Sequence, residues 1–344
     1  LITPLTEIPA WPGPGGRTNG KQTGSGRRRR REGCVNQIKF KEALMKKDII
    51  VPLTDTPLTL LSGITFARVP YWFPFYDYKD LKMDLVLPFR RGGGEKRPLL
   101  VWVCGGAWMT MERSAHLPWL MNFARSGYVI ASVEYRLSNC SHFPSQLEDV
   151  KKGIRFLKAH AGEFGIDPEK VIIGGESAGA HLACMAGVTG DRKEFDKGEY
   201  LEQSGRVQAV IDYYGPASFT WNPKDTRVKA DGEIPDFLRG PSPVNMLLGY
   251  DPADDPEKAD TAAPLSYISP SAPPFFIAHG TEDVVVSIDN SEALCSALEM
   301  NNVPVEFCAV QGAGHADPRF YQAEMADRIM GFLDGICNRR EVTH

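Results

Sequence analysis

The residues best suited to chemistry are a serine, an acid and a histidine, each placed directly after an apolar run. Ser177 lies in Gly175-Glu176-Ser177-Ala178-Gly179, a Gly-x-Ser-x-Gly pattern between the β-branched run Val171–Ile173 and an Ala-rich segment. This context predicts a strand, a sharp turn and a helix, with the helix N-terminus directed at the serine hydroxyl. The two glycines leave room for a strained turn. The pattern therefore predicts an activated serine rather than an ordinary tight turn.

A serine hydroxyl needs a base to accept its proton, and the base needs a carboxylate to orient it. In doubly wound hydrolases the acid and then the histidine follow the serine, each at the end of a later strand. The run 276–279 leads into Glu282 and Asp283. The run Val305–Val310 leads into a Gly-rich turn that ends at His315. We expect His315 to be the base and Asp283 the acid, with Glu282 as the alternative acid.

Nearby polar residues are expected to have structural roles. His181 lies one helical turn after Ser177 and is expected to pack or to hydrogen-bond beneath the turn. His279 is expected to brace the acid turn, and Asp289 to cap the helix that follows. The weaker candidates for the base lie in loops or at a helix end: His116, His142 and His160.

A tetrahedral intermediate also needs N–H donors that are placed in advance. The Ala178 amide, at the start of the predicted helix, is one expected donor. The run Leu99–Val103 leads into Cys104-Gly105-Gly106-Ala107-Trp108, so the amides of Gly106 and Ala107 are the others. The alternative is that the two glycines form only a turn. Trp108 follows these donors directly and is expected to line the substrate pocket.

Strand-like and helix-like segments alternate from about residue 58 onward. This alternation predicts a doubly wound, mostly parallel sheet with helices on both faces. The pattern Ser145-Gln146-Leu147-Glu148 predicts a capping box at the start of one helix. The expected strands are Leu81–Leu87, Leu99–Val103, Val129–Tyr135, Val171–Gly174, Val207–Tyr214, Pro274–His279 and Val305–Val310, and the expected helices are 116–126, 146–160, 177–188, 288–300 and 318–336.

Two segments interrupt this alternation. Residues 215–272 are rich in Pro, Gly, Asp and Asn, and a loop this long inside a compact domain is usually functional. We interpret them as a cap or substrate-binding insertion over the carboxyl edge of the sheet. The second segment, 69–78, combines aromatic rings with prolines. It fits either a pocket wall or lid, or an N-terminal subdomain that packs on the sheet.

Composition separates the first 36 residues from the rest. They are rich in Pro, Gly, Thr and Ser, lack apolar periodicity and contain the run Arg27–Arg31, so they are predicted to be disordered. The arginines fit a solvated tail, a cloning-derived or upstream-translated extension, or a polyanion-binding or nuclear-localisation patch. The first residue is Leu1 rather than Met, which fits a fusion remnant or a processed start. Residues 37–344 are predicted to form one domain.

Charge, hydropathy and cysteine usage limit the expected partners and location. The first 40 residues carry eight Lys or Arg and two Glu, so the rest of the chain has a net charge of −10, which argues against nucleic acid. No apolar run is long enough to cross a bilayer, and no signal peptide is recognisable. Seven scattered cysteines without a Cys-x-x-Cys pair argue against a disulfide framework or a zinc site. We expect a cytoplasmic protein; secretion stays possible if the N-terminus is not native.

These motifs together resemble an α/β-hydrolase of the carboxylesterase kind, close to the acetyl-xylan/feruloyl esterase and hormone-sensitive-lipase branches. The resemblance runs from about Leu81 to Leu333. It rests on the Gly-x-Ser-x-Gly turn, Val133-Glu134-Tyr135-Arg136-Leu137-Ser138, Phe143-Pro144-Ser145-Gln146, Gly165-Ile166-Asp167-Pro168, Tyr213-Tyr214-Gly215-Pro216, His279-Gly280-Thr281-Glu282-Asp283 and Gly312-Ala313-Gly314-His315.

The resemblance implies a catalytic triad of Ser177, Asp283 and His315, with no metal or cofactor. It also implies oxyanion donors at Gly106, Ala107 and Ala178. One departure is Cys104, which stands where the family usually has a histidine that braces the oxyanion loop, so we expect altered loop support rather than altered chemistry.

The predicted function is that of a serine carboxylesterase. It would act through an acyl-enzyme on short acyl and hydroxycinnamoyl (feruloyl) esters, either small molecules or esters linked to plant polysaccharides. The alternatives are an amidase resembling arylformamidases and a non-catalytic binding protein on the same fold. The sequence does not separate esters from activated amides, and it does not give the oligomeric state.

Overall fold

The computed structural model describes most of the chain from residue 48 onward. The described residues between Leu53 and His344 belong to one compact unit. The predicted tail 1–36 lies outside the described residues, as does part of each interrupting segment. The described residues are 48–52, 54, 56–71, 77–89, 95–220 and 242–339.

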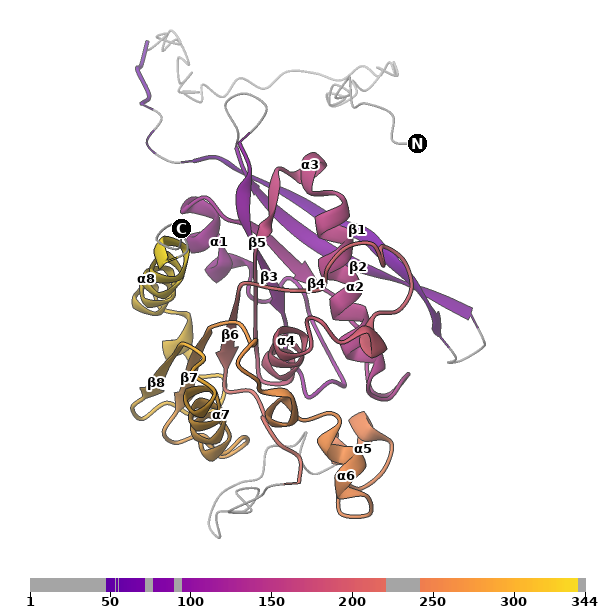
Figure 1. The fold of residues 1–344 in the computed structure, drawn as a ribbon. Coiled ribbons are helices and arrows are strands. Elements are labelled where there is room, and N and C mark those ends of the chain that lie inside the picture. The colour runs from indigo at the N-terminus through magenta and orange to yellow at the C-terminus, as the bar shows by residue number, and fades with distance from the viewer. Residues whose placement is uncertain are drawn as a thin grey trace, which may run out of the picture. The chain divides into compact units, whose positions relative to one another are not determined.

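The core of this unit is an eight-stranded sheet in the order β1-β2-β4-β3-β5-β6-β7-β8 (Figure 1). β2 pairs antiparallel with both of its neighbours, and the pairs from β4 to β8 are all parallel. The doubly wound, mostly parallel sheet is therefore confirmed. The strands are β1 (Leu58–Tyr71), β2 (Asp77–Pro88), β3 (Arg97–Val103), β4 (Val129–Val133), β5 (Ile166–Glu176), β6 (Ala209–Tyr213), β7 (Phe275–Gly280) and β8 (Val305–Val310).

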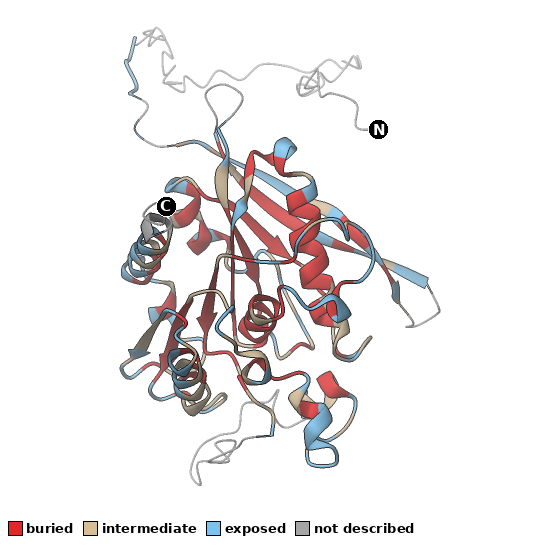
Figure 2. Cartoon of the chain, viewed as in Figure 1, coloured by how far each residue is buried: buried red, intermediate tan, exposed pale blue. Residues whose placement is uncertain are grey.

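Helices cover both faces of the sheet, and Figure 2 shows the central strands buried between them. On one face the strands share a core with α2, α4 and α7, and on the other face with α1 and α8. The α-helices are α1 (Leu117–Arg125), α2 (Ser145–Ala159), α3 (Ala161–Phe164), α4 (Ala178–Val188), α5 (Pro243–Leu248), α6 (Pro256–Asp260), α7 (Asp289–Met300) and α8 (Ala323–Arg339), and the 3₁₀ turns are η1 (Lys193–Phe195), η3 (Pro264–Tyr267) and η4 (Pro318–Tyr321).

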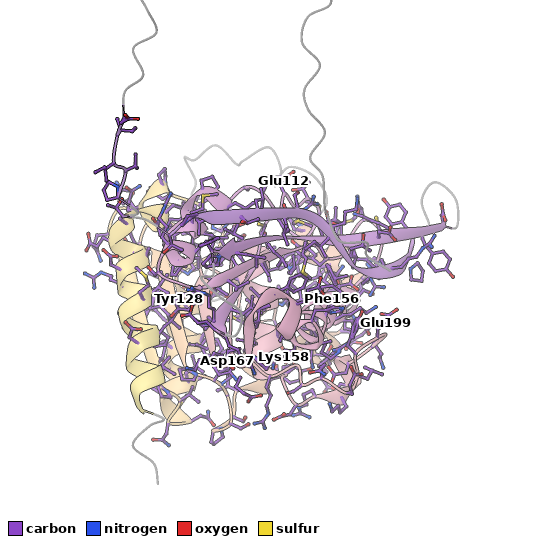
Figure 3. The ribbon with its side chains drawn as sticks, turned by 90° about the horizontal axis from the view of Figure 1, so that it is seen from above. Glu112, Tyr128, Phe156, Lys158, Asp167 and Glu199 are labelled. Atoms are coloured by element: carbon purple, nitrogen blue, oxygen red, sulfur yellow. The ribbon has the colours of Figure 1, made fainter. Side chains whose placement is uncertain are left out.

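The segment after α4 packs along α2. Figure 3 labels Phe156 and Lys158 on α2 and Glu199 in that segment. Lys158 Nζ donates to the Arg206 carbonyl at 2.6 Å, and the rings of Phe156 and Tyr200 are 5.7 Å apart. Burial lowers the pKa of the Lys158 ammonium to about 8. The contact to the Arg206 carbonyl explains how the charged head of Lys158 is accommodated although the residue is buried.

The first strands correct one expectation about the aromatic segment 69–78. Its described residues form strands β1 and β2 of the sheet itself rather than a subdomain packed on it, and none of these described residues lines the cavity beside Ser177. Residues 72–76 lie outside the described residues. β1 was not predicted because it is an edge strand with many exposed positions and so lacks a continuous apolar run.

Three expectations about helix ends are wrong. Pro144, not Ser145, precedes α2 without a side-chain cap, and the Ser145 hydroxyl accepts from Ser141 instead. Asp289 is the first residue of α7 rather than its cap, because Ile288 occupies that position. The helix expected over 318–336 is two elements, the 3₁₀ turn η4 and then α8.

Candidate active site

Ser177 occupies the tight turn between β5 and α4. Its backbone has φ 54° and ψ −122°, a left-handed conformation that is costly for a residue with a side chain. Close packing fixes this turn, because a side chain added at Gly175 would lie 2.6 Å from the backbone of Gly179, and one at Gly179 would meet the Val103 carbonyl. The Ser177 amide donates to the Tyr213 carbonyl at 2.8 Å. The predicted strand, turn and helix are all present.

The chain brings Ser177, His315 and Asp283 together from three separate elements. His315 Nε2 lies 3.0 Å from Ser177 Oγ, and His315 Nδ1 lies 2.7 Å from Asp283 Oδ2. Because a carboxylate only accepts, Nδ1 carries the proton and Nε2 is free to accept from the serine hydroxyl. The serine and the acid therefore lie on opposite nitrogens of one imidazole. This is the arrangement needed to deprotonate a hydroxyl.

Asp283 is held by four donors. Oδ1 accepts from the amides of Val285 and Val286 at 2.8 and 2.9 Å. Oδ2 faces both His315 and His279, whose Nε2 lies 3.3 Å away. Burial alone would raise the pKa of this carboxyl, but the hydrogen bonds from the two histidines hold the pKa well below its usual range. The acid therefore stays ionised beside His315.

His279 braces the acid turn, as expected. Its Nε2 lies 2.9 Å from the Val286 carbonyl, and its Nδ1 lies 2.7 Å from Ser291 Oγ on α7. Nε2 therefore carries the proton, which it shares between the Val286 carbonyl and Asp283 Oδ2, while Nδ1 accepts from the Ser291 hydroxyl. Glu282, the alternative acid, has an exposed side chain, whereas Asp283 contacts the imidazole.

The loop after β3 faces this triad and has an unusual backbone. Gly106, Ala107 and Trp108 have φ of 119°, 55° and 57°, and a side chain at Gly106 would meet the Thr110 carbonyl. Consecutive left-handed residues are typical of functional loops. Among the described residues, the amides of Gly106, Ala107 and Ala178 donate to no other group. They are therefore available to a ligand in the cavity that these residues line with Ser177.

The side chain of Cys104 points into the core rather than supporting the loop. It is 2% exposed, and its Sγ lies 3.8 Å from Ser132 Oγ. Burial raises the pKa of this thiol to about 12. The loop is anchored instead through the Cys104 carbonyl, which accepts from Tyr135 Oη at 3.0 Å, and the Trp108 carbonyl, which accepts from the Ser138 amide at 2.8 Å.

A cavity of about 750 Å³ opens over Ser177 and His315. Its walls come from the loop after β3, the segment after β6, the turn before α7 and part of the expected insertion 215–272. Residues 221–241 of that insertion lie outside the described residues. The apolar lining includes Trp108, Met109, Phe219, Pro243, Val285 and Val286. A pocket of this size is typical of sites for small ligands.

Sequence reasoning assigned no role to some residues of this site. Tyr214, with φ 44°, places its ring 4.8 Å from the His315 ring. Asn290 Oδ1 accepts from the Ala217 amide at 3.1 Å and so fixes the wall that carries Phe219. Glu176 accepts from the Gly105 amide. Tyr214 and Glu176 lie inside recognised motifs, but nothing in the sequence indicates their contacts.

Metal clusters and membrane-spanning helices were sought in the part of the chain that the structure describes. There, no three or more His, Cys, Asp or Glu side chains are grouped so that they could hold a metal ion. Across the same residues, no helix is both long and apolar enough to span a membrane.

Comparison with known proteins identifies a matching family and similar proteins. The family model BD-FAE matches residues 83–298, more than half of the chain. A probable carboxylic ester hydrolase of Mycobacterium tuberculosis, LipM, is 32% identical over 64% of this chain and 49% of its own length. The chain thus spans about half the length of the curated relatives it matches.

Solved structures share the fold. A truncated carbohydrate esterase from gut microbiota superposes with a TM-score of 0.69 at 24% identity, covering 83% of this chain and 98% of that one. A bifunctional GH43-CE protein of Bacteroides eggerthii superposes with a TM-score of 0.64 at 28% identity, covering 74% and 36%. The predicted resemblance to α/β-hydrolase esterases is confirmed. The chain belongs to the BD-FAE family and has the α/β-hydrolase fold.

Proposed function

We propose that this chain is a serine carboxylic ester hydrolase. The observation that carries the proposal is a pair of consecutive contacts. Ser177 Oγ lies 3.0 Å from His315 Nε2, and His315 Nδ1 lies 2.7 Å from Asp283 Oδ2. Ser177 lines the cavity together with Gly106, Ala107 and Ala178, whose amides are available to an oxyanion. The family and the ester hydrolase named among its relatives support the same activity.

The reaction proceeds in two halves. Ser177 Oγ attacks the ester carbonyl carbon while its proton moves to His315 Nε2, and the amides of Gly106, Ala107 and Ala178 hold the oxyanion. The bond to the alcohol then breaks, and Nε2 returns the proton to the leaving oxygen. In the second half, water gives a proton to Nε2 and attacks the acyl carbon. The bond from this carbon to Ser177 Oγ then breaks, and Nε2 returns the proton to Oγ as the acid leaves. Asp283 stabilises the imidazolium in both halves.

The proposed substrates are short acyl esters and hydroxycinnamoyl esters such as feruloyl groups, free or linked to plant polysaccharide. Trp108 and Phe219 lie on the cavity wall with ring centroids 5.8 Å apart, and such rings suit a flat acyl group. A carbohydrate esterase among the structural neighbours agrees with this class in fold alone. The proposal also includes a separate tail over residues 1–36, a cap or substrate-binding insertion over residues 215–272, and a cytoplasmic location.

Two measurements test the activity together: hydrolysis of an ester, and covalent labelling of the protein by a serine-directed phosphonate. Wild type is expected to hydrolyse p-nitrophenyl acetate and to carry the label on Ser177. Ser177→Ala is expected to lose both while keeping its circular dichroism spectrum. Turnover retained by Ser177→Ala, or a label on another residue, would contradict the proposal. Parallel assays with methyl ferulate and N-formylkynurenine separate an esterase from an amidase.

A further inference from the structure

Glu176, the residue just before Ser177, has a polar side chain that the proposed reaction does not use. It lies at the end of β5 with 12% of its side chain exposed and borders the catalytic cavity. Its Oε1 accepts from the backbone amide of Gly105, a charge-assisted hydrogen bond. Gly105 directly precedes Gly106 and Ala107. One carboxylate therefore connects the turn that carries the serine to the loop that carries the oxyanion donors.

The fit between this carboxylate and the loop is close. A side chain added at Gly105 would meet both the carboxylate and the main-chain carbonyl of Glu176. Other contacts also anchor the loop. Tyr135 donates to the Cys104 carbonyl and Ser138 to the Trp108 carbonyl, both from the region after β4, and the Trp108 indole donates to His181 on α4. The hydrogen bond from the Gly105 amide ends on the residue directly before Ser177 in the sequence. It therefore fixes the donors relative to the nucleophile itself.

Rings on the far side hold the carboxylate in place. His116 Nε2 lies 3.3 Å from Oε1, and the His116 ring stacks on Tyr321 with centroids 4.8 Å apart and planes 14° apart. Tyr321 Oη lies 2.7 Å from the hydroxyl of Tyr214, whose ring contacts His315. These neighbours leave few rotamers open to Glu176. Its Oε1 contacts Gly105 and His116 rather than Ser177.

We infer that Glu176 is a positioning residue that sets the oxyanion loop against Ser177 by accepting the Gly105 amide. The inference rests on the proposed function and adds a residue to it. Oxyanion donors act only when they are placed for the transition state, so loosening them lowers kcat more than it raises KM. A residue that bound the substrate directly would change KM instead.

Two variants of similar length separate the hydrogen bond from simple packing. Glu176→Gln keeps a carbonyl oxygen that accepts the Gly105 amide, whereas Glu176→Met keeps the length and removes that acceptor. Glu148→Gln and Glu148→Met form the matched control pair, because Glu148 is 17% exposed, contacts Arg136 at 3.4 Å and borders no part of the cavity.

Glu176→Met is expected to lower kcat for p-nitrophenyl acetate about 10- to 100-fold, less than the loss of a whole oxyanion donor. Its KM should change less than about threefold, and a boronic acid inhibitor should bind more weakly by a similar factor. Glu176→Gln and both Glu148 variants should stay within about threefold of wild type. Equal losses in Gln and Met, an effect confined to KM, or an unchanged Met variant would each overturn the inference.

A measurement on the wild type keeps the inference testable even if Glu176→Met does not fold. In a protein labelled with ¹⁵N-glycine, the Gly105 amide should exchange slowly with solvent and the Gly106 amide quickly. Rapid exchange at Gly105 would overturn the inference. Absence of ester hydrolysis and of Ser177 labelling would instead contradict the proposed function, so the two failures are distinguishable.

Discussion

Trp108 donates its indole N–H to His181 Nδ1 at 3.2 Å and so joins the loop after β3 to α4. His181 Nε2 lies 2.7 Å from the Ala262 carbonyl and donates to it. Both ring nitrogens of a fully buried histidine are thus assigned, and the imidazole is neutral. The histidine nearest to Ser177 in the sequence therefore supports three segments around the site and is not its base.

This arrangement predicts a pH dependence of stability. Burial lowers the pKa of His181 to about 4 from the ordinary 6.5, a difference worth about 3 kcal/mol. Between pH 6.5 and 4 the unfolded chain binds the proton and the folded chain does not. The contribution to the free energy of unfolding is therefore full above pH 6.5 and falls as the pH drops toward 4.

The measurement is urea unfolding between pH 4 and 7.5, comparing wild type with His181→Gln. The variant should lose this part of the pH dependence. Asp212 changes the stability in the opposite direction. Burial raises its pKa to about 6 from 3.8, so its contribution to the free energy of unfolding grows as the pH falls through that range. The difference between the two proteins removes the Asp212 contribution. Parallel stability curves would contradict the assignment of His181.

His315→Ala is expected to lower kcat at least about a thousandfold, because the members of a triad act as a unit. The reason is the 3.0 Å contact from Nε2 to Ser177 Oγ, which is the serine's route for losing its proton. Single-turnover assays with p-nitrophenyl acetate measure the acylation step directly. His142→Ala, an exposed loop histidine that contacts the Met246 carbonyl, serves as the control and should keep wild-type turnover.

Asp283→Asn is expected to lower kcat substantially, though less than His315→Ala. An Asn side chain can present an N–H toward Nδ1 and so favour the wrong tautomer of His315. Glu282→Gln makes the same chemical change one residue earlier, on an exposed side chain, and should leave kcat near wild type. Initial rates of both variants against the same ester decide between the two acids. A larger loss in Glu282→Gln would mean that the acid is misassigned.

The parts of the site that were predictable from the sequence are those fixed by local pattern. The strands that lead to Ser177, Asp283 and His315 are short apolar runs followed by turns, because parallel strands buried on both faces need apolar residues throughout. Each predicted residue therefore sits at a strand's carboxyl end. The order of the strands brings these ends together at one edge.

Contacts between distant segments were not predictable in this way. Glu176 and Gly105 are 71 residues apart and meet because β3 pairs with β5. The cavity walls at 242–256 come from a segment without apolar periodicity, so only its length indicated a role. The capping box also failed, because α2 begins at Ser145 itself and the Ser145 hydroxyl accepts from Ser141.

The last prediction concerns the acyl group. Trp108 is 4% exposed and packs edge-on against Phe219, so Phe219 presents the more accessible ring of the pair to the cavity. In a series of p-nitrophenyl esters, kcat/KM is expected to be highest at two to four carbons, and methyl ferulate is expected to be hydrolysed. Phe219→Ala should lower kcat/KM for methyl ferulate about 3- to 10-fold more than for p-nitrophenyl acetate, because only the cinnamoyl ring contacts that wall. Phe219→Leu keeps apolar volume without a ring and should fall between wild type and Phe219→Ala. A series that peaks at long acyl chains, or equal losses on both esters, would place the acyl group elsewhere in the cavity.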